Sequence, residues 1–305
     1  MNPVSSPYFV IAGPTGVGKS ELAVALAEAC GGEIVGADAF QVYDGLKILT
    51  AQAPAEFRLR VAHHLVGEVP LLRVFDVGQY LRVAREKIGE VWGRGLVPIV
   101  TGGSGLYLRA LGKGLADLPE ANAGLRADLE GRPLAEIVRE LAVLDPVGVT
   151  QIDVKNPRRV IRALEVCLLA GRPFSSFREE WSGPSRYFRG ALLTCGREEL
   201  NRRIDRRTER MFGAGVIEEV EAVGEIGATA SQALGFREIR DYLAGKIGRG
   251  DCLASVQQST RRYAKRQVTW FRREPELEAV DFGEGQAFDQ VVGILAERVR
   301  RMASE

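Results

Sequence analysis

Apolar runs alternate with glycine-containing turns along the first third of the chain, and each run predicts a buried strand. The clearest runs cover residues 8–12, 33–37 and 96–100, and a later one covers 191–194. Residues 20–30 are mainly Ala, Leu and Glu, which predicts a helix ending at Gly31. The alternation predicts an α/β fold with a parallel sheet flanked by helices. Pro98 in the third run favours an edge position for that strand.

The pattern changes after Gly112, where Pro and Gly interrupt short helical pieces until the strand at 191–194. We interpret residues 113–188 as a helical insertion domain between two parts of the α/β core, 1–112 and 189–305. Its clearest helix covers 158–170, because Pro157 suits a first helical position and Gly171 suits the residue after the last. The apolar stripe that we expect to be buried consists of Val160, Ile161, Leu164, Cys167 and Leu168.

The turn between the first strand and the first helix fits G-x-x-x-x-G-K-[ST], the phosphate-binding P-loop. A strand, a glycine-rich turn and a helix N-terminus aim backbone N–H groups at an anion, and the lysine adds a positive charge. The serine hydroxyl can reach a Mg²⁺ ion. The pattern predicts a P-loop NTPase-like site for a diphosphate or triphosphate and leaves open which molecule carries it. The residues of the loop are Gly13, Pro14, Thr15, Gly16, Val17, Gly18, Lys19 and Ser20.

Asp38 follows the second apolar run directly, at the strand end where α/β proteins bind ligands. Three roles are consistent with this position: a turn or N-cap carboxylate, a Mg²⁺ ligand of the Walker-B type, and a catalytic base. The position alone does not distinguish the last two roles.

Charge is distributed unevenly along a chain whose net charge is only +1, from 41 basic and 40 acidic residues. Residues 200–212 contain five arginines, and residues 255–273 contain six basic residues and no acid. In the insertion, Glu165 alone balances Arg158, Arg159 and Arg162. A basic amphipathic helix could favour an anionic membrane, but beside an α/β core the phosphates of a nucleic acid are the better partner.

Other features restrict the class of protein. The four scattered cysteines form no C-x-x-C pattern, so neither a zinc ribbon nor a disulfide framework is indicated. His63 and His64 are a poor metal pair, because neighbouring helical residues point in different directions, and we assign them structural roles. No signal peptide and no apolar stretch of membrane-spanning length is evident. We expect a cytoplasmic monomer with no membrane partner.

Together these segments resemble the tRNA dimethylallyltransferases, also called tRNA isopentenyltransferases, over about residues 9–273. The P-loop alone would be weak evidence, whereas its combination with the two C-terminal motifs is specific. The matching segments are GPTGVGKS at 13–20, VTGGSGLYL at 100–108, NPRRVIRALEV at 156–166, RRIDRR at 202–207, ALGFREI at 233–239 and STRRYAKRQVTWFR at 259–272.

The resemblance implies that N6 of the adenosine 3′-adjacent to the anticodon attacks C1 of dimethylallyl diphosphate, which the P-loop holds in place of ATP. It implies Mg²⁺ as cofactor and the tRNA anticodon stem-loop and dimethylallyl diphosphate as partners. Asp38 would be the base, while Thr15, Lys19 and Arg207 would stabilise the leaving diphosphate with Mg²⁺ on Ser20. The attacked adenine must leave its stack and enter a channel.

The resemblance also implies a set of tRNA-contacting positions, spread over both parts of the chain. These positions are Asp38, Ala39, Phe40, Gln41, Ser104, Arg126, Arg158, Arg159, Val160, Ile161, Arg162, Gln232, Ala233, Leu234, Gly235, Phe236, Arg237, Ser259, Thr260, Arg261, Arg262, Tyr263, Ala264, Lys265 and Arg266.

The sequence departs from the family pattern around Asp38. Ala39 stands where serine is usual, Leu49-Thr50-Ala51-Gln52 replaces Gly-Thr-Ala-Lys, and Ser104 replaces threonine. Ala39 and Leu49 alter the loop itself, and Gln52 removes a positive charge that would favour RNA binding.

Three other functions fit part of the sequence. A small-molecule P-loop kinase would use Asp38 as a Mg²⁺ ligand but would leave the basic C-terminal helix without a role. A prenyltransferase acting on a free adenine nucleotide, as the related adenylate isopentenyltransferases do, would share the phosphate site, although the insertion and the arginine-rich helices favour a large RNA. A non-catalytic RNA-binding protein would tolerate the altered loop, but Lys19, Ser20, Asp38 and Arg207 are all retained.

Overall fold

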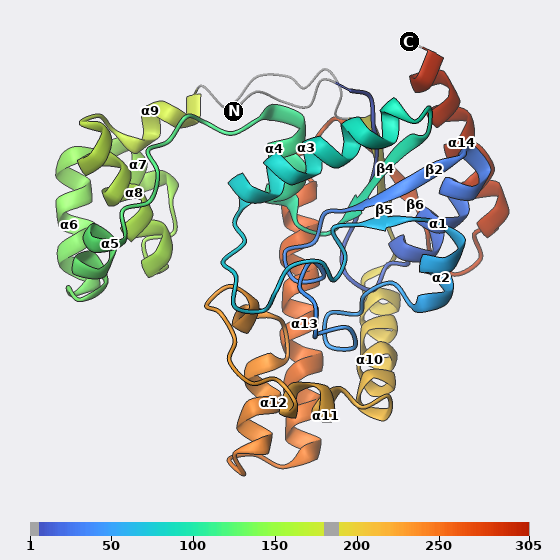
Figure 1. The fold of residues 1–305 in the computed structure, drawn as a ribbon. Helices are drawn as coiled ribbons and strands as arrows, with labels where there is room; N and C mark the ends of the chain where they lie inside the picture. The colour runs from blue at the N-terminus through green and yellow to red at the C-terminus, as the bar shows by residue number, and fades with distance from the viewer. Residues whose placement is uncertain (1–5, 180–188, 305) are drawn as a thin grey trace. The chain divides into compact units, whose positions relative to one another are not determined.

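The computed structural model of the chain describes residues 6–179 and 189–304. These residues form two compact units, which Figure 1 shows as ribbons. One unit comprises residues 113–179, and the other comprises residues 6–112 and 189–304. The smaller unit is therefore inserted in the chain between the fourth and fifth strands of the larger one.

The larger unit is built on a parallel sheet of six strands, which confirms the predicted fold class. The sheet order is β3-β2-β4-β1-β5-β6, so β1, which leads into the P-loop, is an interior strand. Because all pairs are parallel, the segments that follow β1, β2 and β4 meet at one edge of the sheet. The strands are β1 (Phe9–Ala12), β2 (Gly32–Gly36), β3 (His63–His64), β4 (Val97–Gly102), β5 (Arg189–Thr194) and β6 (Leu277–Asp281).

β4 pairs with β1 on one side and β2 on the other, so the prediction that Pro98 marks an edge strand is wrong. Pro98 is the second residue of β4 and pairs with Glu33 of β2, whereas pairing with β1 begins at Ile99. The missing N–H therefore lies at the start of the strand, where proline is tolerated.

The two edges of the sheet are strands that the hydrophobic pattern does not reveal. β6 has the sequence LEAVD, with most of its side chains at least partly exposed, and β3 contains only His63 and His64. Nδ1 of His63 lies 2.8 Å from the Val61 carbonyl oxygen, and Nε2 of His64 lies 2.6 Å from the Glu33 carboxylate. Both rings thus have partners within the fold, although they lie on a strand and not on a helix.

Helices cover both faces of the sheet (Figure 1). α1 (Lys19–Cys30) and α14 (Phe288–Ser304) pack together and share a core with β1, β4 and β5. α3 (Val77–Gly93) packs on β2 and β4, and α4 (Gly105–Lys113) follows β4. The short α2 (Ala55–Arg60) contacts α1.

A second helical layer follows β5, and its core includes Leu46 and Leu49 from the loop after β2. The basic segment 255–273 forms a helix as far as Phe271, as the later part of α13, whose buried stripe begins at Cys252. The elements are α10 (Arg197–Gly213), α11 (Val216–Glu221), a 3-10 helix (Ala230–Gln232), α12 (Phe236–Leu243) and α13 (Arg249–Phe271), which gather below the sheet in Figure 1.

The smaller unit is entirely helical in its described part. Its central helix α8 begins at Pro157, after the Asn156 cap, and ends before Gly171, whose φ of 63° lies in the left-handed region. Leu168, which was predicted to be buried, is 42% exposed, because the buried stripe turns towards Cys167 in the last turn. The helices are α5 (Ala123–Glu130), α6 (Leu134–Leu144), α7 (Pro146–Gln151), α8 (Pro157–Ala170) and α9 (Phe174–Glu179).

Candidate active site

The P-loop joins β1 to α1 and presents its backbone at the N-terminus of that helix. Gly13, Gly16 and Gly18 have φ values of 153°, 86° and 106°, a region that favours glycine. A Cβ at Gly18 would lie 2.7 Å from the ring of Phe282, so the loop is also tightly covered there. Within the described structure no side chain caps the N-terminus of α1, which leaves its N–H groups for an anion.

Lys19 brings a partly buried ammonium group to this loop. Its Nζ donates a hydrogen bond to the Pro14 carbonyl oxygen at 2.8 Å. Burial lowers the pKa of Lys19 to about 8; the Asp38 carboxylate opposes this change and Arg207 adds to it. A polyanion bound in the loop would favour the charged form.

Arg207 approaches the loop from α10. Its Nη2 donates to Oγ1 of Thr15 at 2.7 Å, and its buried Nε has no hydrogen-bond partner among the described residues. Burial lowers the pKa of Arg207, an effect that Asp38 opposes. One turn earlier, Arg203 donates to the Val17 carbonyl oxygen at 3.0 Å. α10 therefore supplies two guanidinium groups to the P-loop, and an anionic ligand would satisfy the donor that is left over.

Asp38 stands opposite these cations, just beyond the end of β2. Its Oδ1 accepts hydrogen bonds from the backbone N–H groups of Phe40 at 3.0 Å and Gln41 at 3.3 Å, which is the geometry of a turn aspartate. The neighbouring Ala39 N–H donates to Oγ of Ser104 at 2.9 Å. Because the two turn bonds use Oδ1, the other carboxylate oxygen can serve the cavity, so the turn role and a chemical role are compatible.

The loop after Asp38 is closed by two glutamines. Gln41 Nε2 donates to the carbonyl oxygens of Thr50 and Ala51, both at 3.2 Å. Gln52 stands where the family usually has lysine. Its Nε2 donates to the backbone carbonyl oxygens of Gln41 at 3.0 Å and Tyr43 at 2.7 Å. In this chain position 52 is therefore a structural contact of the loop.

The departure at Leu49 is also accommodated within the fold. Its side chain is buried in the core that the loop shares with α11, α12 and α13. The Glu219 carboxylate of α11 accepts the N–H groups of Ile48 and Leu49, both at 2.8 Å. A helix far along the chain thus fixes the loop that carries Asp38.

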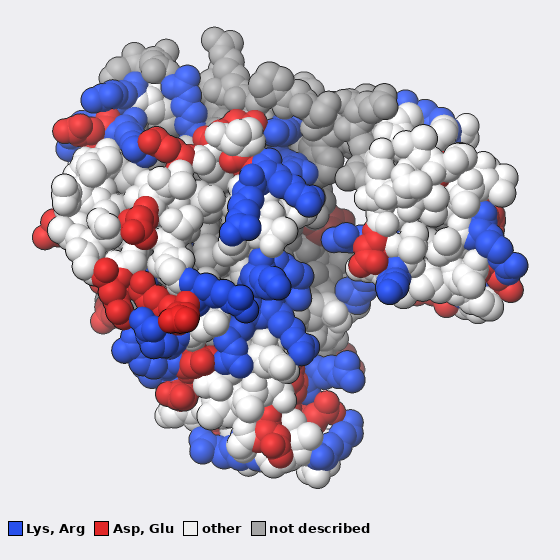
Figure 2. Space-filling model, turned by 180° about the vertical axis from the view of Figure 1, so that it is seen from behind, with Lys and Arg blue, Asp and Glu red and all other residues white. Residues whose placement is uncertain are grey.

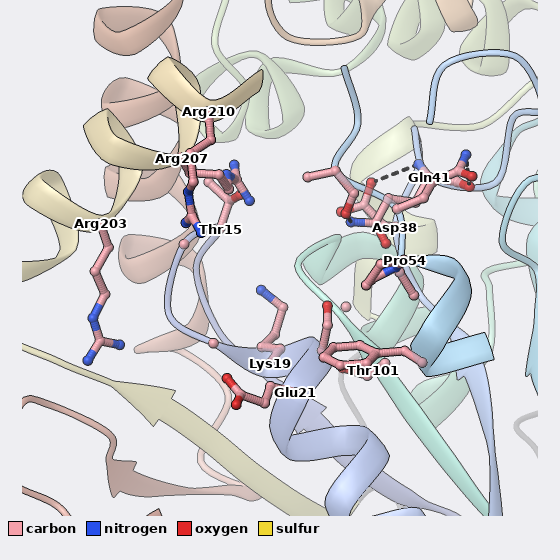
Figure 3. Close-up of a pocket in the computed structure, with 18 of the residues that line it drawn as sticks. Thr15, Lys19, Glu21, Asp38, Gln41, Pro54, Thr101, Arg203, Arg207 and Arg210 are labelled. Atoms are coloured by element: carbon pink, nitrogen blue, oxygen red, sulfur yellow. Dashed lines mark hydrogen bonds between the residues drawn. The ribbon is translucent and has the colours of Figure 1, made fainter. Parts of the chain in front are cut away.

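Two neighbouring cavities meet at Thr15, Asp38, Gln41 and Arg207, which line both. The larger cavity, of about 1170 Å³, contains the P-loop side chains and the arginines of α10. Figure 3 shows Arg203, Arg207 and Arg210 on one side of it, Asp38 and Gln41 on the other, and Lys19 between them. Beyond these shared residues, the smaller cavity is lined by apolar and aromatic side chains and by three threonines: Phe40, Leu49, Met211, Leu234, Val256 and Tyr263, with Thr50, Thr208 and Thr260.

The positions expected to contact tRNA in the larger unit divide into an inner and an outer set. On α13, Arg262, Lys265 and Arg266 are exposed, whereas Thr260 and Ala264 are buried. Arg261 is partly buried and pairs with Asp205 of α10. Figure 2 shows Lys and Arg side chains gathered in the middle of one face of this unit.

The segment before and at the start of α12 divides in the same way. Gln232 and Arg237 are exposed, whereas Ala233 and Phe236 belong to the buried core. Gly235 is buried with a φ of 89°, and a Cβ there would lie 3.1 Å from Val256. Leu234 lines the smaller cavity. Buried members of this stretch can shape the tRNA site but offer no surface of their own.

In the smaller unit, the expected tRNA-contacting positions are largely committed to its own structure. Val160 and Ile161 are buried in its core. Arg126 and Arg162 both pair with the fully buried carboxylate of Glu165, at 2.6 and 2.8 Å. Only Arg158 and Arg159 of this set are exposed. Of the three arginines that Glu165 was expected to balance, it pairs with Arg162, and its second partner is Arg126, so this acid is an internal anchor.

The sequence analysis missed Gln267, a buried polar residue of α13. Its Oε1 accepts the N–H of Thr15 and its Nε2 donates to the Gly103 oxygen, both at 2.9 Å. The available signal was its place on the inward stripe with Tyr263 and Trp270, where a glutamine needs polar partners.

Comparison with known proteins identifies the family of this chain. Residues 41–274 match the IPP transferase family, and residues 7–62 match the isopentenyl transferase family. A tRNA dimethylallyltransferase of Geobacter sulfurreducens is 41% identical over 283 residues, which cover 90% of this chain and 91% of that protein. The chain belongs to the tRNA dimethylallyltransferase family. The Kocuria rhizophila member is 39% identical over 310 residues, covering 98% of this chain and 96% of its own.

Solved structures of family members share the fold. A eukaryotic dimethylallyltransferase acting on tRNA superposes with a TM-score of 0.83 at 26% identity, covering 97% of this chain and 80% of its own. The tRNA isopentenylpyrophosphate transferase of Bacillus halodurans gives a TM-score of 0.70 at 30% identity and covers 98% of both chains. No helix in the described parts of this chain is long and apolar enough to cross a membrane.

Proposed function

We propose that this protein transfers the dimethylallyl group of dimethylallyl diphosphate to N6 of the adenosine 3′-adjacent to the anticodon in tRNA. The observation that carries the proposal is the meeting of two cavities at Thr15, Asp38 and Arg207. One cavity holds a phosphate-binding loop with its cations, and the other is smaller and is lined in part by apolar and aromatic side chains. A diphosphate and a planar base can therefore approach the same carboxylate from different sides.

The diphosphate binds at the N-terminus of α1, where backbone N–H groups and Lys19 meet its charge. The Thr15 hydroxyl accepts from Arg207 and keeps its own proton for donation to the departing oxygen. Arg207 has a buried donor that the described residues leave unmatched. These groups lie on the side of the site where negative charge grows as the bond to C1 breaks, which lowers the barrier.

Mg²⁺ fits the donors of this site. Ser20 lies in the first turn of α1 and lines the larger cavity. The described residues contain no group of three His, Cys, Asp or Glu side chains that could enclose an ion. Mg²⁺ is commonly held through few protein oxygens, with phosphate oxygens and water completing its shell. Ser20 would hold the ion against the diphosphate, where it would neutralise leaving-group charge.

Asp38 takes the proton. As N6 forms its bond to C1, the C1–oxygen bond breaks, diphosphate departs, and one N6 proton passes to the free oxygen of Asp38. The two turn hydrogen bonds at Oδ1 hold the carboxylate in one orientation. A fixed base beside the attacking nitrogen is the arrangement that general-base catalysis requires.

The acceptor is the extruded base of an RNA loop. The smaller cavity is bordered by α13, and the exposed residues Arg262, Lys265 and Arg266 lie on the same helix. Phosphate contacts on α13 would hold the loop while the base enters the cavity. Both sides of the site come from a single chain, which supports a monomer, and a tRNA acceptor supports a cytoplasmic enzyme.

Two other functions can be weighed against the site. A small-molecule kinase would use Asp38 as its Mg²⁺ ligand, but it would leave the exposed basic residues of α13 without a role. A free adenine nucleotide would suit the smaller cavity equally well, but the basic outer side of α13 favours RNA.

One experiment tests the proposal against both alternatives. The protein is incubated with dimethylallyl diphosphate, Mg²⁺ and bulk tRNA that lacks the modification, and the nucleosides are analysed by mass spectrometry. We expect N6-dimethylallyladenosine in tRNA, no comparable product with AMP, and no ATP turnover without RNA. Prenylated AMP at a similar rate would favour the free-nucleotide acceptor, and RNA-independent ATP hydrolysis would favour the kinase.

A further inference from the structure

Gln267 is a buried side chain that touches both halves of the site yet lines neither cavity. We propose that it is a positioning residue, which sets the distance between the diphosphate end and the base end of the reaction. This inference rests on the proposed function, because the two ends are defined by that chemistry.

The oxygen of the Gln267 amide binds the P-loop. Oε1 accepts the Thr15 N–H at 2.9 Å across 252 residues of sequence. The hydroxyl of Thr15 accepts a hydrogen bond from Arg207. The Thr15 backbone is thus tied to α13 while its side chain is tied to α10, so this end of the P-loop is held from two helices.

The nitrogen of the Gln267 amide binds the loop after β4. Nε2 donates to the Gly103 oxygen at 2.9 Å, and a Cβ on Gly103 would lie only 2.2 Å from that nitrogen. The next residue, Ser104, accepts the Ala39 N–H, beside Asp38. The path from Gln267 to Asp38 therefore runs through two hydrogen bonds, the Gly103–Ser104 peptide unit, the Ser104 side chain and the Asp38–Ala39 peptide unit.

These contacts make Gln267 a short rigid link between Thr15 and the Asp38 turn. A side-chain amide is suited to this role, because it accepts on one atom and donates from the other. A shift of about 1 Å between reacting groups can cost on the order of 10²-fold in rate. Loss of the link should therefore appear in kcat, while binding of tRNA on the outer side of α13 is retained.

The test uses two variants of the full chain with one control. Gln267→Met keeps the length but removes both hydrogen bonds. Gln267→Glu keeps the acceptor for Thr15 and places a second oxygen against the Gly103 oxygen, so the donor is absent unless the new carboxyl is protonated. Gln290→Glu makes the same change at an exposed position of α14, away from the proposed tRNA surface.

We expect Gln267→Met to lower single-turnover prenyl transfer on the order of 10²-fold, with tRNA Kd and melting temperature close to wild type. For Gln267→Glu, transfer relative to wild type should recover as the pH falls, because the acid form restores the donor to Gly103. The charged and phenolic side chains of the surrounding site, Asp38, Lys19, Arg207 and Tyr263, are unchanged in the variant, so the ratio to wild type isolates the new carboxyl. Gln290→Glu should match wild type throughout.

The outcomes separate the inference from the function on which it rests. If wild-type protein transfers no prenyl group to tRNA, the proposed function fails. If wild type is active and Gln267→Met transfers within a factor of two of it, the positioning role is wrong. A uniform loss of stability and tRNA binding in both variants, with no recovery of Gln267→Glu at low pH, would make Gln267 a packing residue only.

Discussion

Two arginine-rich helices, α8 and α10, are alike in sequence but have different surroundings. In α8, Arg162 and the nearby Arg126 turn to Glu165, whose carboxylate is fully buried and also accepts the Asn122 N–H. In α10, Arg207 has no ion-pair partner among the described residues, and its buried Nε has no hydrogen-bond partner among them. The difference lies in the position of the nearest acid. Glu165 lies under its helix, so Arg126 and Arg162 hold the fold, whereas Asp38 lies across the cavity from Arg207, which remains available to an anionic ligand.

We expect the largest effect from removing Asp38, the acid that lies across the cavity from Arg207. We expect Asp38→Ala to reduce kcat on the order of 10²–10⁴-fold, the usual cost of losing a general base, with tRNA affinity nearly unchanged. Single-turnover transfer and tRNA Kd measure the two quantities separately. Asp44→Ala, an exposed aspartate of the same loop, is the control. A variant that keeps near wild-type kcat would show that Asp38 is not the base.

We expect the second largest effect from Arg207, which has no ion-pair partner among the described residues. Arg207→Ala removes the donor aimed at the diphosphate, and loss of one such donor costs on the order of 10²–10³-fold in rate. We expect that loss in single-turnover transfer, with tRNA Kd unchanged. Arg202→Ala, on the exposed side of α10, should have little effect on either. A loss confined to tRNA affinity would assign Arg207 to the RNA surface.

Loss of Glu165, the acid that Arg126 and Arg162 share, should mainly lower the stability of the protein. Glu165→Ala leaves Arg126 and Arg162 without their shared carboxylate, which we expect to destabilise the protein by roughly 3 kcal/mol, a low value for a buried pair because both arginines are partly exposed. Thermal and urea unfolding measure this loss, and prenyl transfer per folded molecule should change much less than in Arg207→Ala. An unchanged melting temperature would contradict the anchoring role.

The same acid sets a pH dependence. Although burial alone would raise it, hydrogen bonds from Arg162, Arg126 and the Asn122 N–H hold the pKa of Glu165 below its usual 4.5. A carboxylate with a depressed folded-state pKa contributes stability above its unfolded pKa and loses it as the pH falls through the folded value. Wild type should therefore lose more stability than Glu165→Ala as the pH is lowered from about 5 into this acidic range.

This comparison also shows where sequence reasoning succeeds. The P-loop, its flanking strand and helix, and the bounds of α8 depend on neighbours in sequence, such as Pro157 and Gly171, so local pattern predicts them. Asp38 could be placed at a strand end, but its three possible roles could not be separated. The contacts of Glu165, Glu219 and Gln267 join distant segments, and no local pattern contains them. β6 is a short, mostly exposed edge strand, so it has little hydrophobic signal.

We expect the smallest effect from basic residues that face solvent. They should contribute to tRNA binding and not to catalysis. Lys265 and Arg266 are exposed on α13, one residue before the buried Gln267. We expect Lys265→Ala combined with Arg266→Ala to weaken tRNA binding and to flatten its salt dependence. Each lost phosphate contact should reduce the slope of log K against log[salt] by roughly 0.7–0.9. Dimethylallyl diphosphate binding should be little changed, because Lys19 and Arg207 supply that site with its own cations.

The control for this last variant is Arg300→Ala combined with Arg301→Ala, which removes the same formal charge from exposed positions on α14. If general charge alone attracted tRNA, the two double variants would lower the salt slope equally. If the α13 residues only stabilise the fold, the melting temperature would fall while the slope stayed at its wild-type value. Only a slope change confined to the α13 variant identifies the outer side of this helix as the surface that holds the RNA while its inner side holds the site.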